Sequence, residues 1–282
     1  MAEPRPSGAA MSALGLGTWF LGEGRRPLAA EEAALLAGID AGIHLIDTAE
    51  MYGSGRAEAL IGRVLTHRVR DDLFLVSKVY PHNAGTQHIF LSCENSLRRM
   101  GTDHLDLYLL HWRGSIPLQE TVDCMEALIR QGKIRRWGVS NFDTSDMKEL
   151  FSCYNGDHCA VNQVLYHLGN RGIEHDLLPW HHAHHITTIA YCPLAQGGSL
   201  HRQLLRHPTV LSAVDELGLT PIQILLGFVL HQPNMTAIPR TGSVDHALQL
   251  AAMAGQPLPD EIIEQLSAAF PAPRHKVPLD MQ

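Results

Sequence analysis

The sequence predicts a (β/α)8 barrel, the TIM-barrel fold, and two observations support this prediction. Short aliphatic and β-branched runs alternate along the chain with longer amphipathic runs, a pattern typical of strand–helix units around a parallel sheet. Eight such units follow one another within 282 residues, with no linker, low-complexity segment or change of composition between them. Eight uniform units fit a closed barrel better than an open sheet, so we expect a single domain over residues 1–282.

The strand candidates are short runs of mostly aliphatic and β-branched residues, as the buried strands of parallel sheets usually are. They cover residues 11–16, 44–47, 73–77, 107–110, 136–139, 160–163, 187–191 and 236–238.

The helix candidates lie between and after these strands, at residues 29–41, 56–65, 88–100, 118–131, 145–154, 173–184, 222–230 and 245–254. One helix start is clearly marked, because Thr220, Pro221 and Gln223 form a capping box with proline at the first helical position. The final stretch, residues 270–282, is too rich in proline for a helix, and we expect a surface loop or arm there.

Composition excludes several classes of function. A net charge of −7 argues against nucleic-acid binding, which depends on Lys and Arg contacts to phosphate. No apolar run is long enough to span a membrane, and the first ten residues lack the apolar core of a secretory signal, so we expect a cytoplasmic protein without a membrane partner. Five scattered cysteines without a C-x-x-C pair predict neither a disulfide framework nor a structural zinc site.

Polar residues stand at or just after the ends of the predicted strands. The carboxyl ends of barrel strands meet at one mouth, where enzymes of this fold keep their active sites, so these side chains should converge. They are Asp47, Lys78, His111, Ser140, Asn141, Gln163, Tyr191 and Arg240.

Four residues of this region suit proton delivery. Lys78 follows an apolar run, and a buried ammonium needs a partner, which Asp47 can supply across the mouth. The phenol of Tyr52 has an ordinary pKa of about 10, and a nearby Lys78 should lower that pKa. His111 could orient a carbonyl or share the proton. The group lacks a nucleophile, so it must serve an external one, and a hydride fits.

The sequence around these residues resembles the aldo/keto reductase family. The resemblance is carried in order by residues 45–53 (LIDTAEMYG), 76–78 (VSK), 109–112 (LLHW), 132–135 (GKIR), 138–142 (GVSNF), 162–163 (NQ), 190–194 (AYCPL) and 238–241 (IPRT), and it extends from about Leu14 to Ala254. Within the family the chain is most similar to bacterial methylglyoxal reductase-type members, which share residues 165–169 (LYHLG) and a Pro-Ala-Pro near the C-terminus.

The resemblance implies a catalytic set of Tyr52, Lys78, Asp47 and His111, with Tyr52 as general acid, Lys78 and Asp47 tuning it, and His111 orienting the carbonyl. It also implies a substrate pocket formed by Trp19, Met51, Tyr80, His111 and Trp112, although aromatic residues in these places also occur as packing. An aromatic, largely apolar pocket without an anion-binding arginine suits neutral aldehydes and ketoaldehydes.

The cofactor that the resemblance implies is NADPH. Ser140, Asn141 and Gln163 would hold the nicotinamide carboxamide, and Tyr191 would stack beneath the ring. Arg240 takes the place of the family's 2′-phosphate lysine, and a guanidinium there favours NADPH over NADH. The other residues expected at the cofactor are Gly17, Thr18, Trp19, Asp47, Cys192, Pro193, Leu194, Gln196, Gly197, Ile238, Pro239, Thr241, Ser243, His246 and Gln249.

The chain departs from the family at several of these positions. Cys192 stands where many relatives have serine, His246 where arginine is common, and Leu250 where asparagine usually contacts the adenine. These departures affect the part of the site that would hold the pyrophosphate and the adenosine.

Three functions are compatible with this pattern. The favoured one is reduction of small reactive aldehydes such as methylglyoxal. The second is the same chemistry on another carbonyl, such as pyridoxal, a sugar or a xenobiotic ketone. The third is a cofactor-sensing regulatory subunit that turns over slowly.

Two further motifs are set aside. Gly15 and Gly17 begin a G-x-G-x-x-G pattern, but Phe20 replaces the third glycine, so a Rossmann site is not expected. His181, His182, His184 and His185 have helical spacing, with His181, His184 and His185 expected on one face. No carboxylate or cysteine lies beside them at ligand spacing, so no metal is expected.

Overall fold

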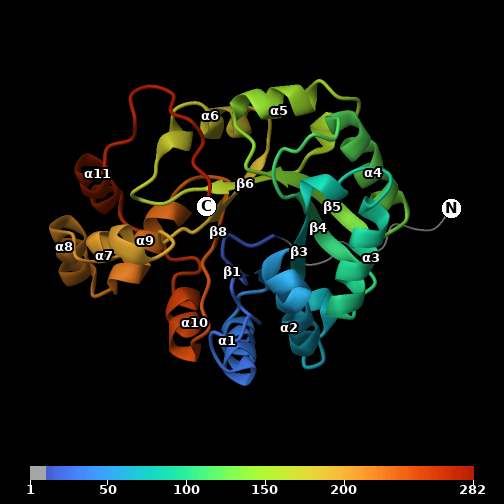
Figure 1. Cartoon of the computed structure of the whole chain (residues 1–282). Helices are drawn as coiled ribbons and strands as arrows, with labels where there is room; N and C mark the ends of the chain where they lie inside the picture. The colour runs from blue at the N-terminus through green and yellow to red at the C-terminus, as the bar shows by residue number, and fades with distance from the viewer. Residues whose placement is uncertain (1–10) are drawn as a thin grey trace.

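The structure, a computed structural model, describes residues 11–282 as a barrel of parallel strands enclosed by helices (Figure 1). Residues 1–10, on which the expected lack of a secretory signal rests, lie outside the described residues. Each of the eight strands pairs in parallel with its sequence neighbour, and bridges from Leu14 to Ala237 and from Gly17 to Arg240 join the last strand to the first. The predicted (β/α)8 fold is confirmed.

Every predicted strand is present, with boundaries shifted by a few residues. The strands are β1 Gly15–Gly17, β2 Leu45–Asp47, β3 Phe74–Val79, β4 Leu105–Leu110, β5 Ile134–Ser140, β6 Val161–Leu165, β7 Thr187–Tyr191 and β8 Met235–Ile238. β3 continues two residues beyond the prediction, so Lys78 lies inside this strand, where it pairs in register with Leu109 of β4.

The predicted helices correspond to α1 Leu28–Asp40, α2 Arg56–Leu65, α3 Ile89–Met100, α4 Leu118–Arg130, α5 Thr144–Phe151, α6 Leu177–Ala183, α9 Pro221–Leu230 and α10 Val244–Ala251. The expected capping box of Thr220 and Gln223 begins α9. The predicted helix over 173–184 was wrong in its first half, because Gly172–Glu174 forms one 3-10 turn and Asp176 leaves helical geometry before α6 begins.

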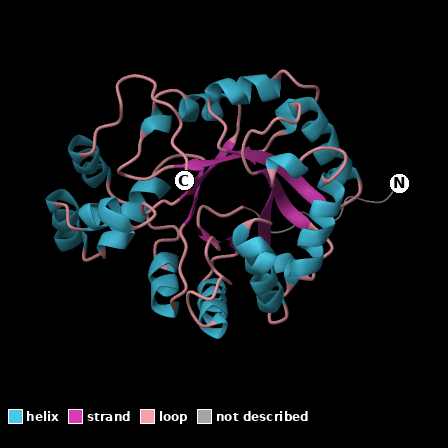
Figure 2. Ribbon diagram, in the orientation of Figure 1, coloured by secondary structure: helices cyan, strands magenta, loops and turns pink. Residues whose placement is uncertain are grey.

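The sequence pattern did not predict three further helices, α7 Gly198–Leu205, α8 Pro208–Leu217 and α11 Asp260–Ala269. They gather beside α9 at one side of the ring, away from α2 to α5 (Figures 1 and 2). α7 begins at Gly198 and α8 at Pro208, and because glycine and proline normally signal turns, the sequence pattern does not reveal these helices.

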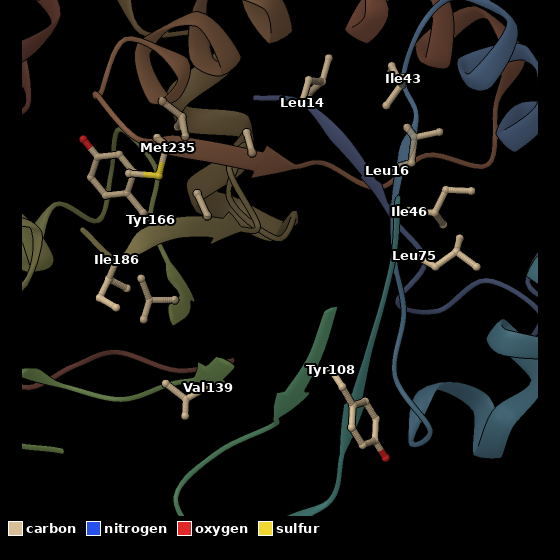
Figure 3. Close-up of a cluster of buried hydrophobic side chains, with 14 of the residues drawn as sticks. Leu14, Leu16, Ile43, Ile46, Leu75, Tyr108, Val139, Tyr166, Ile186 and Met235 are labelled. Carbon is tan, nitrogen blue, oxygen red and sulfur yellow. The ribbon is translucent and has the colours of Figure 1, made fainter. Parts of the chain in front are cut away.

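The core consists of an outer layer between the strands and helices and a smaller layer inside the barrel. Figure 3 shows part of the outer layer, with side chains of β1 to β5, of β8 and of neighbouring segments. The inner layer consists of Leu45, Phe74, Val76, Leu107, Leu109, Val161, Ile189 and Ile238.

The inner layer explains the direction of the polar residues at the strand ends. Side chains alternate between the two faces of a strand, so a residue two positions after an inner-layer residue also points inside. Asp47 follows Leu45 in this way, and Lys78 follows Val76. The same spacing links Leu109 to His111, Val161 to Gln163, Ile189 to Tyr191 and Ile238 to Arg240. The barrel thus has an apolar floor with polar side chains above it.

The C-terminal residues 270–282 form no helix, as predicted. This arm returns across the end of the barrel, where Lys276 lies 3.1 Å from Asp176 and 3.6 Å from Asp143, and Asn170 Nδ2 donates to Asp280 Oδ2 at 2.8 Å.

Within residues 11–282, no single helix has both the length and the apolar character needed to cross a membrane. The pair α8 and α9 meets the criterion only when joined across a 94° bend. Most of α9 is buried against the barrel, which accounts for its apolar composition.

His181 does not share an exposed face with His184 and His185, contrary to the sequence expectation. Its ring is buried, with Nδ1 2.8 Å from the Thr188 hydroxyl and Nε2 3.1 Å from Asn162 Nδ2, whereas His184 and His185 are exposed. Both ring nitrogens of His181 are therefore occupied. Across the described residues, no three His, Cys, Asp or Glu side chains are grouped as metal ligands.

Burial of His181 predicts a loss of stability in acid. Burial lowers its pKa to about 3 from an ordinary 6.5, so below pH 6.5 the unfolded chain takes up a proton that the folded chain refuses until about pH 3. The free energy of unfolding should fall by about 1.4 kcal/mol per pH unit on this account between those values. In urea titrations, the free energy of unfolding of His181→Gln should fall less steeply with acidification than that of the wild type. At pH 8, where His181 is neutral in both states, the difference in free energy of unfolding between variant and wild type gives the packing cost of the substitution. An unchanged slope would contradict the assignment.

Candidate active site

The described residues enclose a cavity of about 360 Å³ at the carboxyl ends of the strands. Most residues that the sequence placed at a site line this cavity. They are Gly17, Trp19, Asp47, Met51, Tyr52, His111, Trp112, Ser140, Asn141, Gln163, Tyr191, Cys192, Pro193, Leu194, Gln196, Gly197, Ile238, Pro239, Arg240, Thr241, His246 and Gln249.

Four expected site residues do not line the cavity. Lys78 lies just behind its wall. Thr18 is fully buried, and its hydroxyl donates to the Asp47 carbonyl at 3.0 Å. The Tyr80 ring packs edge-on against Trp112 at 5.9 Å, one layer behind the wall. Ser243 donates its backbone N–H to the Thr241 hydroxyl at 3.1 Å.

Leu250, at the position expected near the adenine, also lines the cavity, as do residues that the sequence did not assign to a site: Phe20, Ala195, His201, Ile222 and Gln282. Phe20 could have been found, because it directly follows Trp19. Gln282 could not, since its position depends on the path of the C-terminal arm.

A buried ammonium lies behind the wall at the inner end of the cavity. Lys78 Nζ donates to Asp47 Oδ1 at 2.6 Å, to the Thr48 carbonyl at 2.8 Å and to the Tyr52 hydroxyl at 3.2 Å. The second oxygen of Asp47 accepts from Gln163 Nε2 at 2.7 Å. Because every donor of Lys78 is used and both oxygens of Asp47 are bonded, the pair is locked in one geometry.

Burial shifts the pKa values of this group. It pushes the pKa of Lys78 down and that of Asp47 up, and the ion pair of 2.6 Å opposes both shifts. Burial also raises the pKa of Tyr52 well above its usual value, and the negative charge of Asp47 adds to this rise. The expected lowering of the Tyr52 pKa by Lys78 was therefore wrong for this cavity, where desolvation of the phenolate is the larger effect. Tyr52 keeps its proton.

A 3-10 turn places the phenol of Tyr52 beside Lys78. The turn covers Tyr52–Gly55, with Gly53, Ser54 and Gly55 at φ values of 57°, 57° and 86°. Glycine adopts this left-handed region without penalty, whereas Ser54 is held there at some cost. The turn thus carries the ring from the end of β2 back over Lys78, whose Nζ lies 4.8 Å from the ring centre.

A second carboxylate, Glu58 at the start of α2, lies behind Lys78. Glu58 is fully buried and accepts from the Ser77 hydroxyl at 2.6 Å and from Arg99 Nε at 2.5 Å. Its charge helps to raise the pKa of Lys78 against the effect of burial. Glu58 lies outside the motifs that carried the resemblance, so the sequence did not predict a second carboxylate at the site.

His111 is neutral at ordinary pH. Burial lowers its pKa well below 6.5, and the charge of Lys78 lowers it further. Its ring meets the Tyr52 ring edge-on at 5.7 Å, and its buried Nδ1 makes no hydrogen bond within the described chain. The imidazole and the phenol thus lie side by side at the cavity wall.

The opposite wall carries side-chain amides, a hydroxyl and an aromatic ring. The Tyr191 hydroxyl donates to Asn141 Oδ1 at 2.8 Å, Asn141 Nδ2 donates to the His111 carbonyl at 3.1 Å, and the Ser140 hydroxyl donates to the Gln163 carbonyl at 2.8 Å. Asn141 adopts the left-handed region at φ 60°, which asparagine tolerates better than most residues. These bonds link the ends of β4, β5, β6 and β7 into one rigid surface.

Comparison with known proteins agrees with this geometry. Residues 13–270 match the model of the aldo/keto reductase family. The chain is 50% identical to methylglyoxal reductase YeaE of Escherichia coli (strain K12) over 96% of this chain and 95% of that protein. It is 36% identical to an aldo-keto reductase of Mycobacterium avium (strain 104) over 80% of this chain and 75% of that protein.

Two crystal structures of an aldo/keto reductase from Klebsiella pneumoniae have the same fold. One is a complex with NADP and acetate and the other a complex with NADPH. Each has a TM-score of 0.93 and 51% identity, covering 96% of this chain and 95% of the compared one. The family match covers most of the chain, and both relatives exceed 30% identity over more than two thirds of it. The chain belongs to the aldo/keto reductase family of oxidoreductases.

Proposed function

We propose that this protein uses NADPH to reduce small aldehydes and ketoaldehydes, such as methylglyoxal, to alcohols, with Tyr52 as the proton donor. The observation that carries the proposal is the position of Lys78 Nζ, 2.6 Å from Asp47 and 3.2 Å from the Tyr52 hydroxyl, behind the wall of a large cavity. This arrangement delivers a proton and holds no nucleophile of its own, so it complements a hydride donor.

The residues of the cavity fit a nicotinamide dinucleotide phosphate, which supplies the hydride when bound. Ser140, Asn141 and Gln163 would hold the carboxamide, and Tyr191 would lie beneath the ring. Arg240 lines the other part of the cavity, and no hydrogen bond or ion pair joins its guanidinium to another described residue. An unpaired guanidinium at the wall of a cavity suits a phosphate group.

The protein's own groups act on the oxygen of the carbonyl. Negative charge develops on that oxygen as the carbonyl carbon is reduced, and the Tyr52 hydroxyl donates its proton there. Lys78 stabilises the phenolate that Tyr52 becomes, because its ammonium already lies 3.2 Å from the hydroxyl. Asp47 holds Lys78 in place. His111, being neutral, offers an N–H to the same oxygen without competing for the proton.

The substrate end of the cavity supports a small, neutral substrate. Trp19, Met51 and Trp112 form its walls next to His111 and Tyr52. Among the described lining residues the only Lys or Arg is Arg240, which the cofactor would engage, so no cation is left for an acidic substrate. The 50% identity to a methylglyoxal reductase supports the same choice.

Steady-state kinetics with a panel of carbonyls tests the proposal. We expect the highest kcat/KM with methylglyoxal and similar short aldehydes, and lower values with pyridoxal, a sugar and a bulky xenobiotic ketone. A single slow turnover per bound cofactor with every substrate would contradict the proposal and favour a regulatory subunit.

The same assay tests the cofactor. Because Arg240 lies free in the cavity, kcat/KM should be clearly higher with NADPH than with NADH at a saturating aldehyde concentration. Equal values with the two cofactors would contradict the assignment of Arg240 to the 2′-phosphate.

A further inference from the structure

Three guanidinium groups gather where the loop between β1 and α1 meets the end of β8. Arg25 and Arg26 lie on that loop, and Arg240 lines the cavity; all three side chains are exposed. Burial lowers the pKa of Arg240, and the positive charges of Arg25 and Arg26 lower it further, so the three groups are close enough to repel one another. A protein with a net charge of −7 thus keeps three like charges together at one edge of its cavity.

The ring of Phe20 fixes the position of two of these groups. The guanidinium carbon of Arg25 lies 3.7 Å from the ring centre and that of Arg240 lies 6.0 Å from it. Trp19 stacks on the same ring at 4.5 Å. Phe20 itself has a φ of 70°, an unfavourable backbone conformation for a bulky residue. The loop therefore tolerates local strain at Phe20, and the Phe20 ring both lines the cavity and holds Arg25 beside Arg240.

Arg26 lies against the turn that leads into α10. A Cβ placed on Gly242 would lie 3.1 Å from Arg26 Cδ, so glycine lets this side chain pass close to the backbone between Thr241 and Ser243. Thr241 lines the cavity. Arg26 thus reaches the same end of β8 as Arg240.

Carboxylates do not neutralise the group. The buried Glu31 lies near Arg240 but already accepts the Gly22 N–H at 2.8 Å, and Glu23 lies 3.8 Å from Arg25. No hydrogen bond or ion pair connects Arg26 to another residue in the range 11–282. Three cations beside two partly engaged carboxylates leave an excess of positive charge at the rim of the cavity, which favours a bound anion.

We propose that Arg25 and Arg26 join Arg240 to form the site that recognises the 2′-phosphate of NADPH, and that they help to select NADPH over NADH. The inference rests on the proposed use of NADPH. The loop arginines would supply positive charge that α10 lacks, since the residues of α10 that line the cavity are His246, Gln249 and Leu250.

Binding of the two nucleotides tests this site without reference to turnover. Dissociation constants of NADPH and NADH would be measured by quenching of protein fluorescence for the wild type, Arg25→Ala, Arg26→Ala and Arg130→Ala. Loss of a charge-assisted contact should weaken NADPH binding by roughly tenfold in each loop variant. NADH binding should stay within about twofold, because NADH lacks the phosphate that these contacts would hold. Arg130→Ala removes the same charge from the exposed end of α4 and should bind both nucleotides as the wild type does.

The outcomes separate this inference from the proposed function. If the wild type prefers NADPH but the loop variants weaken both nucleotides equally, the two arginines act on a phosphate common to both nucleotides and the inference fails. It also fails if the variants weaken neither nucleotide. A wild type that binds the two nucleotides equally would overturn the proposed use of NADPH itself, and the inference with it, before any variant is compared.

Discussion

Replacement of Tyr52 with phenylalanine is expected to lower kcat/KM for aldehyde reduction by roughly 10²–10⁴-fold, the usual contribution of a positioned general acid. The substitution removes one oxygen and leaves the ring, which packs against His111 and Trp19 at centroid distances of 5.7 and 6.3 Å. NADPH binding should therefore stay close to that of the wild type. Because Tyr52 is protonated at all ordinary pH values, the loss should be similar at pH 6 and at pH 8.

Tyr108→Phe is the matched control. Tyr108 is also fully buried with a pKa raised well above its usual value, but it belongs to the outer layer of the core, and its hydroxyl makes no hydrogen bond within the described chain (Figure 3). Its loss should leave kcat/KM unchanged and should not lower the melting temperature, since removal of an unsatisfied hydroxyl costs little. Wild-type kcat in Tyr52→Phe, or an equal loss in Tyr108→Phe, would show that the phenol of Tyr52 is not the acid.

The fold could be predicted from the sequence because its pattern is local and repeats eight times. Most strands are short and largely apolar, and several inward polar residues come two positions after an inner-layer residue, as Lys78 follows Val76 and Gln163 follows Val161. The period of the strand fixes the direction of such side chains. The sequence alone therefore placed Asp47, Lys78, His111 and Gln163 at one mouth of the barrel.

Features that depend on loops could not be predicted in the same way. Tyr52 lies on a 3-10 turn with positive φ angles, so its distance to Lys78 follows from no periodic pattern. Tyr80 was expected in the pocket because it stands next to a catalytic segment, but the path of the chain after β3 turns it behind Trp112. The contribution of Phe20 to the cavity depends on an unusual backbone angle.

The direction of the Tyr52 pKa shift also could not be predicted from the sequence, because it depends on how deeply the phenol is buried. The sequence shows that a lysine lies near the phenol, and the approach of opposite charge lowers the pKa of an acid. It does not show how deeply the phenol is buried, and here the cost of burying a phenolate outweighs the attraction of Lys78. In this cavity Tyr52 is protonated before the reaction despite the nearby Lys78. Lys78 would therefore contribute by stabilising the phenolate as the proton passes to the substrate.

Replacement of Lys78 with methionine is expected to abolish most of the activity and to destabilise the fold. Loss of the ammonium removes the charge that would stabilise the phenolate, so kcat should fall about as far as in Tyr52→Phe, by roughly 10²–10⁴-fold. It also leaves Asp47 buried with Gln163 as its one remaining side-chain partner among residues 11–282. Removal of one member of a buried ion pair typically costs about 3–5 kcal/mol of stability, measured here by urea denaturation.

The double variant Lys78→Met with Asp47→Asn separates the two effects. The amide of asparagine carries no charge to bury, so most of the lost stability should return, while activity should stay as low as in the single variant. If activity returned with stability, Lys78 would serve only to hold the barrel mouth in shape, and the charge beside Tyr52 would have no part in the reaction. Stability without activity would instead mean that the ammonium acts on the phenol itself. That result would explain why the barrel keeps a buried charge pair where methionine and asparagine would fold as well.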